Sequence, residues 1–103
     1  GPGAEAGDER RRELAERASA RFKVLSDPTR VTILASLMHR PQSVTDLATR
    51  FRLSQPTVSV HIKALREAGL LEGTRSGSST HYQATRDRVE RLLAEAQEGL
   101  FSR

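Results

Sequence analysis

The stretch that decides the fold is residues 54–71, SQPTVSVHIKALREAGLL. Ser54 is a preferred N-cap residue, and Pro56 falls in the first helical turn, where a missing N–H group costs nothing. Gly69 predicts the end of the helix, because glycine readily takes the left-handed conformation found there. We therefore predict a helix that begins just after Ser54 and ends shortly before Gly69.

The two faces of this predicted helix differ in character. At 100° per residue, Val58, Ile62 and Leu65 share one side, which must pack inward. The opposite arc carries no acidic side chain before Glu67. It consists of Gln55, Pro56, Ser59, Val60 and Lys63, with Thr57 and His61 on its flank. Such an arc suits contact with the phosphates and base edges of DNA, and an ordinary solvated helix face is the alternative.

A second helix is predicted immediately before this one. Ser43 followed three residues later by Asp46 is a capping-box pattern, which marks a helix start. An apolar face then follows at helical spacing, formed by Val44, Leu47, Ala48 and Phe51. A short helix, a turn and a second helix with a polar N-terminal arc are typical of a helix-turn-helix, here over residues 43–69. Two packed helices joined by a tight turn also occur in other helical bundles.

A β-hairpin is predicted directly after the helix-turn-helix. Residues 70–75 and 80–85 form two short strands, with the Gly/Ser-rich residues 75–79 as their turn. A hairpin in this place is a wing, over residues 70–85. Arg75 near its tip could reach a phosphate or the minor groove of DNA, or it could be an ordinary solvated arginine.

The segment before the helix-turn-helix predicts a further helix over residues 28–39. Asp27 supplies its N-cap and Pro28 its first position, while Arg40-Pro41 ends it. Its expected buried residues are Val31, Leu34, Leu37 and Met38. The opening Gly-Pro-Gly looks like a tag-cleavage remnant, and we predict a disordered tail over residues 1–7.

Amphipathic helices are predicted at both ends of the remaining chain, over residues 8–25 and 86–101. Each carries one apolar stripe at helical spacing on an otherwise charged surface. The two stripes contain Leu14, Ala18, Phe22, Val89, Leu92, Leu93, Ala96 and Leu100. We interpret them as a joint dimer surface, with packing against their own domain as the alternative. The predicted fold is therefore mainly α with a small β-hairpin: a homodimeric winged helix-turn-helix of order α-α-α-α-β-β-α, forming one domain over residues 8–103.

Charge and composition narrow the function. The net charge is +4, and residues 27–86 hold eight basic and four acidic side chains, which favours a polyanionic partner. The absence of cysteine excludes disulfides, thiolate metal ligands and cysteine chemistry. No apolar run approaches the ~20 residues of a membrane span, so we expect a cytoplasmic protein without a membrane partner. Neither a Gly-rich phosphate loop nor a clustered catalytic set is present, so we do not expect an enzyme.

These residues resemble the ArsR/SmtB family of bacterial winged-helix repressors. LSDPTRVTIL (25–34) is similar to the family's opening of the second helix, SVTDLATRFRLSQPTVSVHIKALREAGLL (43–71) to its helix-turn-helix, and HYQAT (81–85) to its wing. The resemblance covers roughly residues 22–85. It implies a homodimer, joined through its first and last helices, that binds an operator palindrome and is released by an effector. Carried over by position and joined with the outward-facing basic residues, the expected DNA contacts are Ser54, Gln55, Thr57, Ser59, Val60, His61, Lys63 and Arg75.

The ligand patterns of the family's metal sensors are not matched. The set on the third helix would need cysteines where this chain has Val44, Asp46 and Leu47, and no histidine follows Asp87 in the last helix. His39, His61 and His81 fall on three different predicted elements. No metal is therefore assigned, and His39 and His81 are weak candidates for a non-standard nickel, cobalt or zinc site.

The leading hypothesis is a sequence-specific DNA-binding regulator, most simply an effector-responsive repressor. The alternative is a winged-helix protein-interaction module that uses the same fold without DNA. That alternative predicts an acidic or apolar outward face, and Gln55, Ser59 and Lys63 argue against it. The sequence leaves open the operator, the regulated genes, repression against activation, and whether the signal is a metal, a small molecule or a partner protein.

Overall fold

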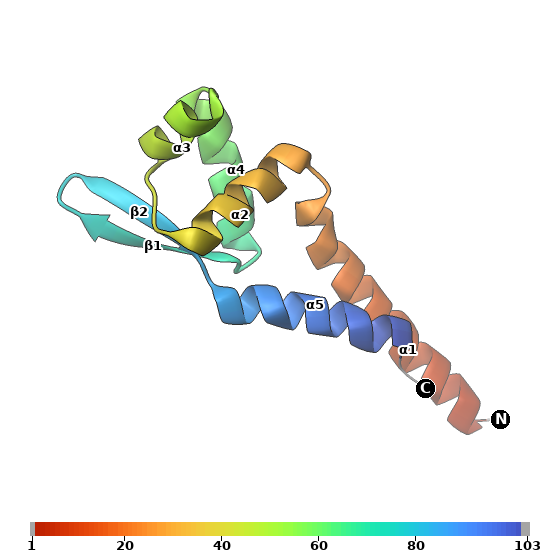
Figure 1. Ribbon diagram of the computed structural model, residues 1–103. Coiled ribbons are helices and arrows are strands. Elements are labelled where there is room, and N and C mark those ends of the chain that lie inside the picture. The colour runs from red at the N-terminus through yellow and green to blue at the C-terminus, as the bar shows by residue number, and fades with distance from the viewer. Residues whose placement is uncertain (1, 102–103) are drawn as a thin grey trace.

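The computed structural model describes residues 2–101, in the predicted order of helices with a two-stranded wing (Figure 1). The elements are α1 (Pro2–Phe22), a 3₁₀ helix η1 (Lys23–Leu25), α2 (Pro28–His39), α3 (Val44–Phe51), α4 (Gln55–Glu67), β1 (Leu71–Ser76), β2 (Ser79–Ala84) and α5 (Arg86–Phe101). The order α-α-α-α-β-β-α confirms the predicted winged helix-turn-helix fold. Contrary to the predicted tail, α1 already begins at Pro2, where proline's fixed φ suits a first helical position.

The core lies where α2, α3, α4 and the base of the wing meet. Its members are aliphatic: Ile33, Leu34, Leu37, Leu47, Ala48, Val58, Ile62, Leu65, Leu70, Leu71 and Leu92. The prediction that Val31 is buried is wrong, because this side chain is 40% exposed while Ile33 is fully buried. The buried stripe of α2 is centred on Ile33, Leu34 and Leu37, and Val31 lies outside it.

Local capping fixes the helix ends, as the sequence predicts. The Asp27 carboxylate accepts hydrogen bonds from the backbone N–H groups of Thr29 and Arg30 at the start of α2. Ser43 and Asp46 form the complete capping box of α3. At the end of α4, Gly69 has φ +76°, and the next residue's N–H group bonds back to the carbonyl of Leu65. This closure turns the chain directly into β1.

The wing is a tight antiparallel hairpin that projects away from α1 (Figure 1). Its turn is shorter than predicted, because Arg75 pairs with Thr80 and Ser76 with Ser79, which leaves two residues to reverse the chain. The segment between α2 and α3 is joined to the wing by two backbone hydrogen bonds between Gln42 and Tyr82, of 2.9 and 2.8 Å. The wing is therefore attached to the body of the helix-turn-helix as well as to α4.

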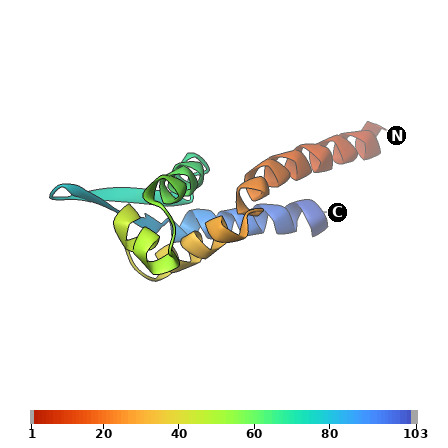
Figure 2. The same ribbon diagram turned by 90° about the horizontal axis from the view of Figure 1, so that it is seen from above.

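Helices α1 and α5 pack together at the opposite end of the molecule from the wing (Figures 1 and 2). An ion pair between Arg21 and Glu95 joins them, and Ala18 is the one buried side chain of α1. The described chain measures 60 × 22 × 18 Å, and its radius of gyration of 16.8 Å exceeds the ~13 Å typical of a compact domain of this length. The pair of helices thus extends well beyond the core.

Candidate nucleic-acid interface

The N-terminal half of α4 presents an exposed polar face beside the core. Its inward side chains, Val58, Ile62 and Leu65, are almost completely buried, as the spacing predicts. On the outside lie six of the predicted contact residues, all exposed: Ser54, Gln55, Thr57, Ser59, Val60 and Lys63. No acidic residue stands among them. The structure therefore brings together a face that phosphates and base edges can approach without meeting a negative side chain.

His61 is not part of this face, which corrects the sequence-based expectation. The side chain is only 9% exposed, and its Nδ1 accepts a hydrogen bond from Nε of Arg30 at 3.2 Å. Arg30 also donates to the carbonyl oxygen of Val24 in η1. Three positions separate His61 from buried Val58, so at 100° per residue it borders the inward stripe, and the arginine on α2 draws it in. His61 thus links α4 through Arg30 to η1, the turn that follows α1.

The start of α4 is held by the side chain of Ser54. Its Oγ accepts the backbone N–H of Thr57 at 3.2 Å and lies 2.8 Å from Oγ1 of that threonine. The N-cap therefore shapes the same turn that carries the exposed polar face.

Two substitutions at Ser54 should separate its structural and binding roles. Ser54→Ala should lower stability by about 1 kcal/mol, because the cap is lost, which corresponds to roughly 4–8 °C in melting temperature. Ser54→Asp should retain the cap, and therefore most of the stability, while it weakens DNA binding by placing a carboxylate against phosphates. Calorimetric melting and fluorescence anisotropy with DNA measure the two effects. Equal DNA affinity of wild type and Ser54→Asp would place Ser54 outside the interface.

Two further basic side chains lie in the wing or against it, and one of them, Arg75, was expected from the sequence. Arg75 is exposed and lies within β1, near the tip. Arg66, which that analysis did not single out, stands over the ring of Tyr82 with its guanidinium carbon 5.8 Å from the ring centroid. This cation–π contact brings a charge from α4 against β2. The sequence contains an arginine in the helix and an aromatic residue in the wing, which could form such a contact. Nothing in their spacing along the chain showed that Arg66 and Tyr82 lie together.

The structure does not bring the histidines together. His39 is exposed at the end of α2, and His61 is buried beside Arg30. Nε2 of His81 is 4.0 Å from a carboxylate oxygen of Asp46. Across residues 2–101, no three histidine, aspartate or glutamate side chains are grouped so that they could hold a metal ion. The weak metal candidates His39 and His81 are therefore not part of any such group within the described residues.

Comparison with known proteins gives the same class as the fold. A family profile described as "Bacterial regulatory protein, arsR family" matches residues 27–72. The HTH-type transcriptional regulator NmtR of Mycobacterium tuberculosis is 36% identical over 82% of this chain and 70% of its own length. The arsenical resistance operon repressor of Bacillus subtilis is 33% identical over 85% of each chain. The regulator KmtR of M. tuberculosis is 37% identical, and the aligned region spans 58% of its length.

Comparison with solved structures gives the same class of protein. An ArsR-like transcriptional regulator from Rhodococcus superposes with a TM-score of 0.72 at 31% identity, over 79% of this chain and 76% of the other. A homodimeric winged helix-turn-helix DNA-binding domain from Mycobacterium bovis gives a TM-score of 0.66 at 32% identity, with the same coverage. The fold and its exposed α4 face thus define a winged helix-turn-helix transcription regulator. The chain belongs to the ArsR family of bacterial regulatory proteins.

One further property concerns the membrane. Among the helices that the structure describes between residues 2 and 101, none is both long and apolar enough to cross a bilayer.

Proposed function

We propose that this protein is an effector-responsive transcriptional repressor that acts in the cytoplasm and binds a palindromic operator as a homodimer. The observation that carries the proposal is the exposed, acid-free face on the N-terminal half of α4, held in place by the Ser54 cap. A protein-interaction module would need an acidic or apolar face here. Val60 is apolar and 62% exposed, but Gln55, Ser59 and Lys63 around it are polar or basic.

The exposed side chains divide by chemistry into two groups. The first group is short or uncharged and suits hydrogen bonds and apolar contacts at base edges in the major groove. It consists of Ser54, Gln55, Thr57, Ser59 and Val60. Lys63 and Arg75 are exposed cations, which suit phosphates of the backbone. We therefore assign sequence preference to the first group and general affinity to the second.

The dimer is proposed to form through α1 and α5. Leu93 and Leu100 are 54% and 78% exposed on α5, although both belong to its apolar stripe. A groove of about 220 Å³ between the helices is lined by Ala15, Ala18, Phe22, Ala96, Gly99 and Leu100. A second copy of this chain would cover these surfaces, and the M. bovis domain with the same fold is described as homodimeric. Leu14, Phe22, Val89 and Ala96 from the predicted stripes are half-buried already.

Selection of bound sequences from a random DNA pool tests the proposal. The enriched sequences should contain two inverted half-sites about 34–36 Å apart, which is roughly one turn of B-DNA. Affinity for the selected operator should fall steeply with salt, by about 0.9 in log K per log salt for each phosphate contacted. A pool that shows no enrichment, together with salt-independent binding, would contradict the proposal.

A further inference from the structure

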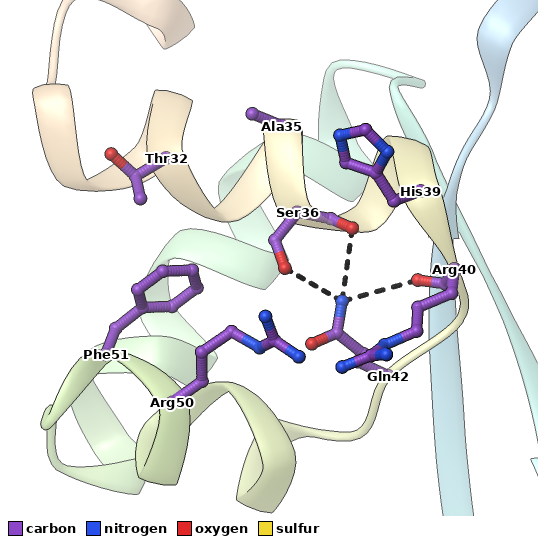
Figure 3. Close-up of a pocket in the computed structure, with 8 residues that line it drawn as sticks. All are labelled: Thr32, Ala35, Ser36, His39, Arg40, Gln42, Arg50 and Phe51. Carbon is purple, nitrogen blue, oxygen red and sulfur yellow. Dashed lines mark hydrogen bonds between the residues drawn. The ribbon is translucent and has the colours of Figure 1, made fainter.

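A second hollow, away from the exposed face of α4, lies between α2 and α3 (Figure 3). Its volume is about 350 Å³, within the range of small-molecule sites. The lining comes from α2, from the segment that follows it and from the last turn of α3, and includes Ala35 and Phe51 on the apolar side. The hollow therefore has the size and the mixed polarity of a site for a small organic molecule.

The most informative residue in this hollow is Gln42, whose side chain is 3% exposed. Its Nε2 donates to the carbonyl oxygen of Ser36 at 3.1 Å, to Oγ of the same serine at 2.9 Å, and to the carbonyl oxygen of Arg40 at 3.4 Å. Because carbonyl oxygens only accept hydrogen bonds, these partners fix which end of the amide is nitrogen. The amide oxygen Oε1 is left on the other side, facing the hollow (Figure 3).

No residue within 2–101 donates a hydrogen bond to Oε1 of Gln42, although the atom is buried. A buried oxygen without a donor is costly, and most buried polar groups in proteins find a partner. The structure thus holds an acceptor ready for an N–H or O–H group of an occupant. In Figure 3 the guanidinium of Arg50 lies beside this oxygen. The side chain of Arg50 is exposed, so it can turn when an occupant enters.

The charge of the hollow is positive. His39, Arg40 and Arg50 line it, and no acidic side chain does. Neither arginine forms an ion pair with any acidic residue of the described part of the chain. A guanidinium without a carboxylate partner can bind one in its two-pronged geometry. The adjoining hollow shares both arginines with this one and contains Asp46, whose pKa is lowered mainly by the hydrogen bond from the backbone N–H of Ser43. The Ser43 cap holds this carboxylate, and the charge of Arg40 also lowers its pKa, so Arg50 is the principal group for binding an anion in this hollow.

We propose that this hollow binds a small organic acid that carries a hydroxyl or N–H donor beside its carboxylate and an apolar body. Arg50, with Arg40, binds the carboxylate, and Oε1 of Gln42 accepts the neighbouring donor. The ring of Phe51 and the side chain of Ala35 contact the apolar part. The inference rests on the proposed function and extends it by naming the class of effector.

An occupant of this site would touch α2, α3 and the segment between them, which is bonded to the wing. The backbone of Gln42 is hydrogen-bonded to Tyr82 of the wing, and Arg50 and Phe51 end the helix that packs against α4. Binding here can therefore change the placement of α3 and of the wing relative to α4. By linkage, an acid that binds the free protein better than the DNA complex lowers operator affinity by the same factor.

The site is tested with three probes, two of which each lack one group of the first. Each probe is titrated into the full chain in the absence of DNA. The probes are 3-phenyllactate, which has both carboxylate and hydroxyl, 3-phenylpropionate, which lacks the hydroxyl, and 2-phenylethanol, which lacks the carboxylate. We expect 3-phenyllactate to bind at least about tenfold more tightly than either other probe, as calorimetry and shifts of the Gln42 side-chain amide resonances measure. Arg50→Ala should lower the affinity for 3-phenyllactate by a similar factor.

Arg52→Ala is the matched control, because Arg52 is an exposed arginine two residues further on that does not line the hollow. It should leave binding of 3-phenyllactate unchanged. Gln42→Leu should remove the preference for 3-phenyllactate over 3-phenylpropionate, and a melting curve shows whether that variant is folded.

Four results would overturn the inference. The first two are that no probe binds, or that inorganic phosphate binds as tightly as 3-phenyllactate. The others are that Arg50→Ala and Arg52→Ala lose equal affinity for 3-phenyllactate, or that Arg50→Ala loses operator affinity while its affinity for the probes is unchanged. The last result would assign Arg50 to a DNA phosphate. Because the titrations contain no DNA, failure of the proposed function would appear separately, as lack of operator binding by the unliganded protein.

Discussion

Replacing Leu93 and Leu100 with glutamate should convert the dimer into a monomer and lower operator affinity by about 100-fold or more, since the two half-sites would no longer be bound by one molecule. Both leucines are exposed in the protomer, so the change removes little from its own core. Two copies would bring four new carboxylates into a shared apolar surface, where unpaired charges are strongly unfavourable. Light scattering should give about 11.4 kDa for the variant and twice that mass for the wild type.

Leu92 is not a suitable target for this experiment. The sequence placed Leu92 in the dimer surface, but it is 1% exposed and belongs to the core of its own protomer. A charge at Leu92 would therefore unfold the chain and say nothing about association. Arg91→Glu is a suitable control, because it changes the net charge by the same two units on the other side of α5. A double variant that stays dimeric, or a monomer that keeps full operator affinity, would contradict the two-fold arrangement.

Lys63→Glu should weaken binding to every DNA sequence by about 100-fold at moderate salt, since each copy in a dimer replaces an attraction to phosphate with a repulsion. Lys63→Ala should reduce the slope of log K against log salt by about 1 per copy. Gln55→Ala should behave differently. It should leave affinity for unrelated DNA nearly unchanged and lower the preference for the operator by ~1–3 kcal/mol per contact.

Fluorescence anisotropy with the selected operator and with a scrambled duplex, at several salt concentrations, measures all three variants. Arg12→Glu makes the same charge change on the exposed surface of α1, on the side away from its apolar stripe, and should have a much smaller effect. If Lys63→Glu and Gln55→Ala altered operator and scrambled DNA in the same proportion, the division of α4 into phosphate-binding and base-reading side chains would be wrong.

Local chemistry explains why much of this fold could be predicted. Asp27, Ser43, Ser54 and Gly69 act on backbone groups within four residues of themselves, so their roles can be recognised without knowing the tertiary structure. Helix α2 begins at the predicted residue for that reason. The inward stripe of α4 could also be predicted, because one apolar face of a helix must be buried.

Residues at the border between two faces could not be placed in this way. His61 turns inward because of Arg30, 31 positions earlier in the chain, and no spacing rule links the two. Val31 and Leu92 were misplaced for the same reason, since the neighbouring helix decides which side of an apolar stripe is covered. The hollow around Gln42 depends on α2, α3 and the wing together, and the sequence offered no sign of it. The DNA contacts on α4 stay predictions until binding is measured.

The length of α1 has a consequence for the amount of protein that is folded. This helix has 21 residues and one buried side chain, so within a single chain little holds its N-terminal half in place. In a dimer that joins through α1, part of the free energy of unfolding comes from association, and the melting temperature rises with protein concentration. Folding and abundance then depend on each other: a cell that keeps few copies of this regulator also keeps a larger fraction of them incompletely folded and open to proteolysis.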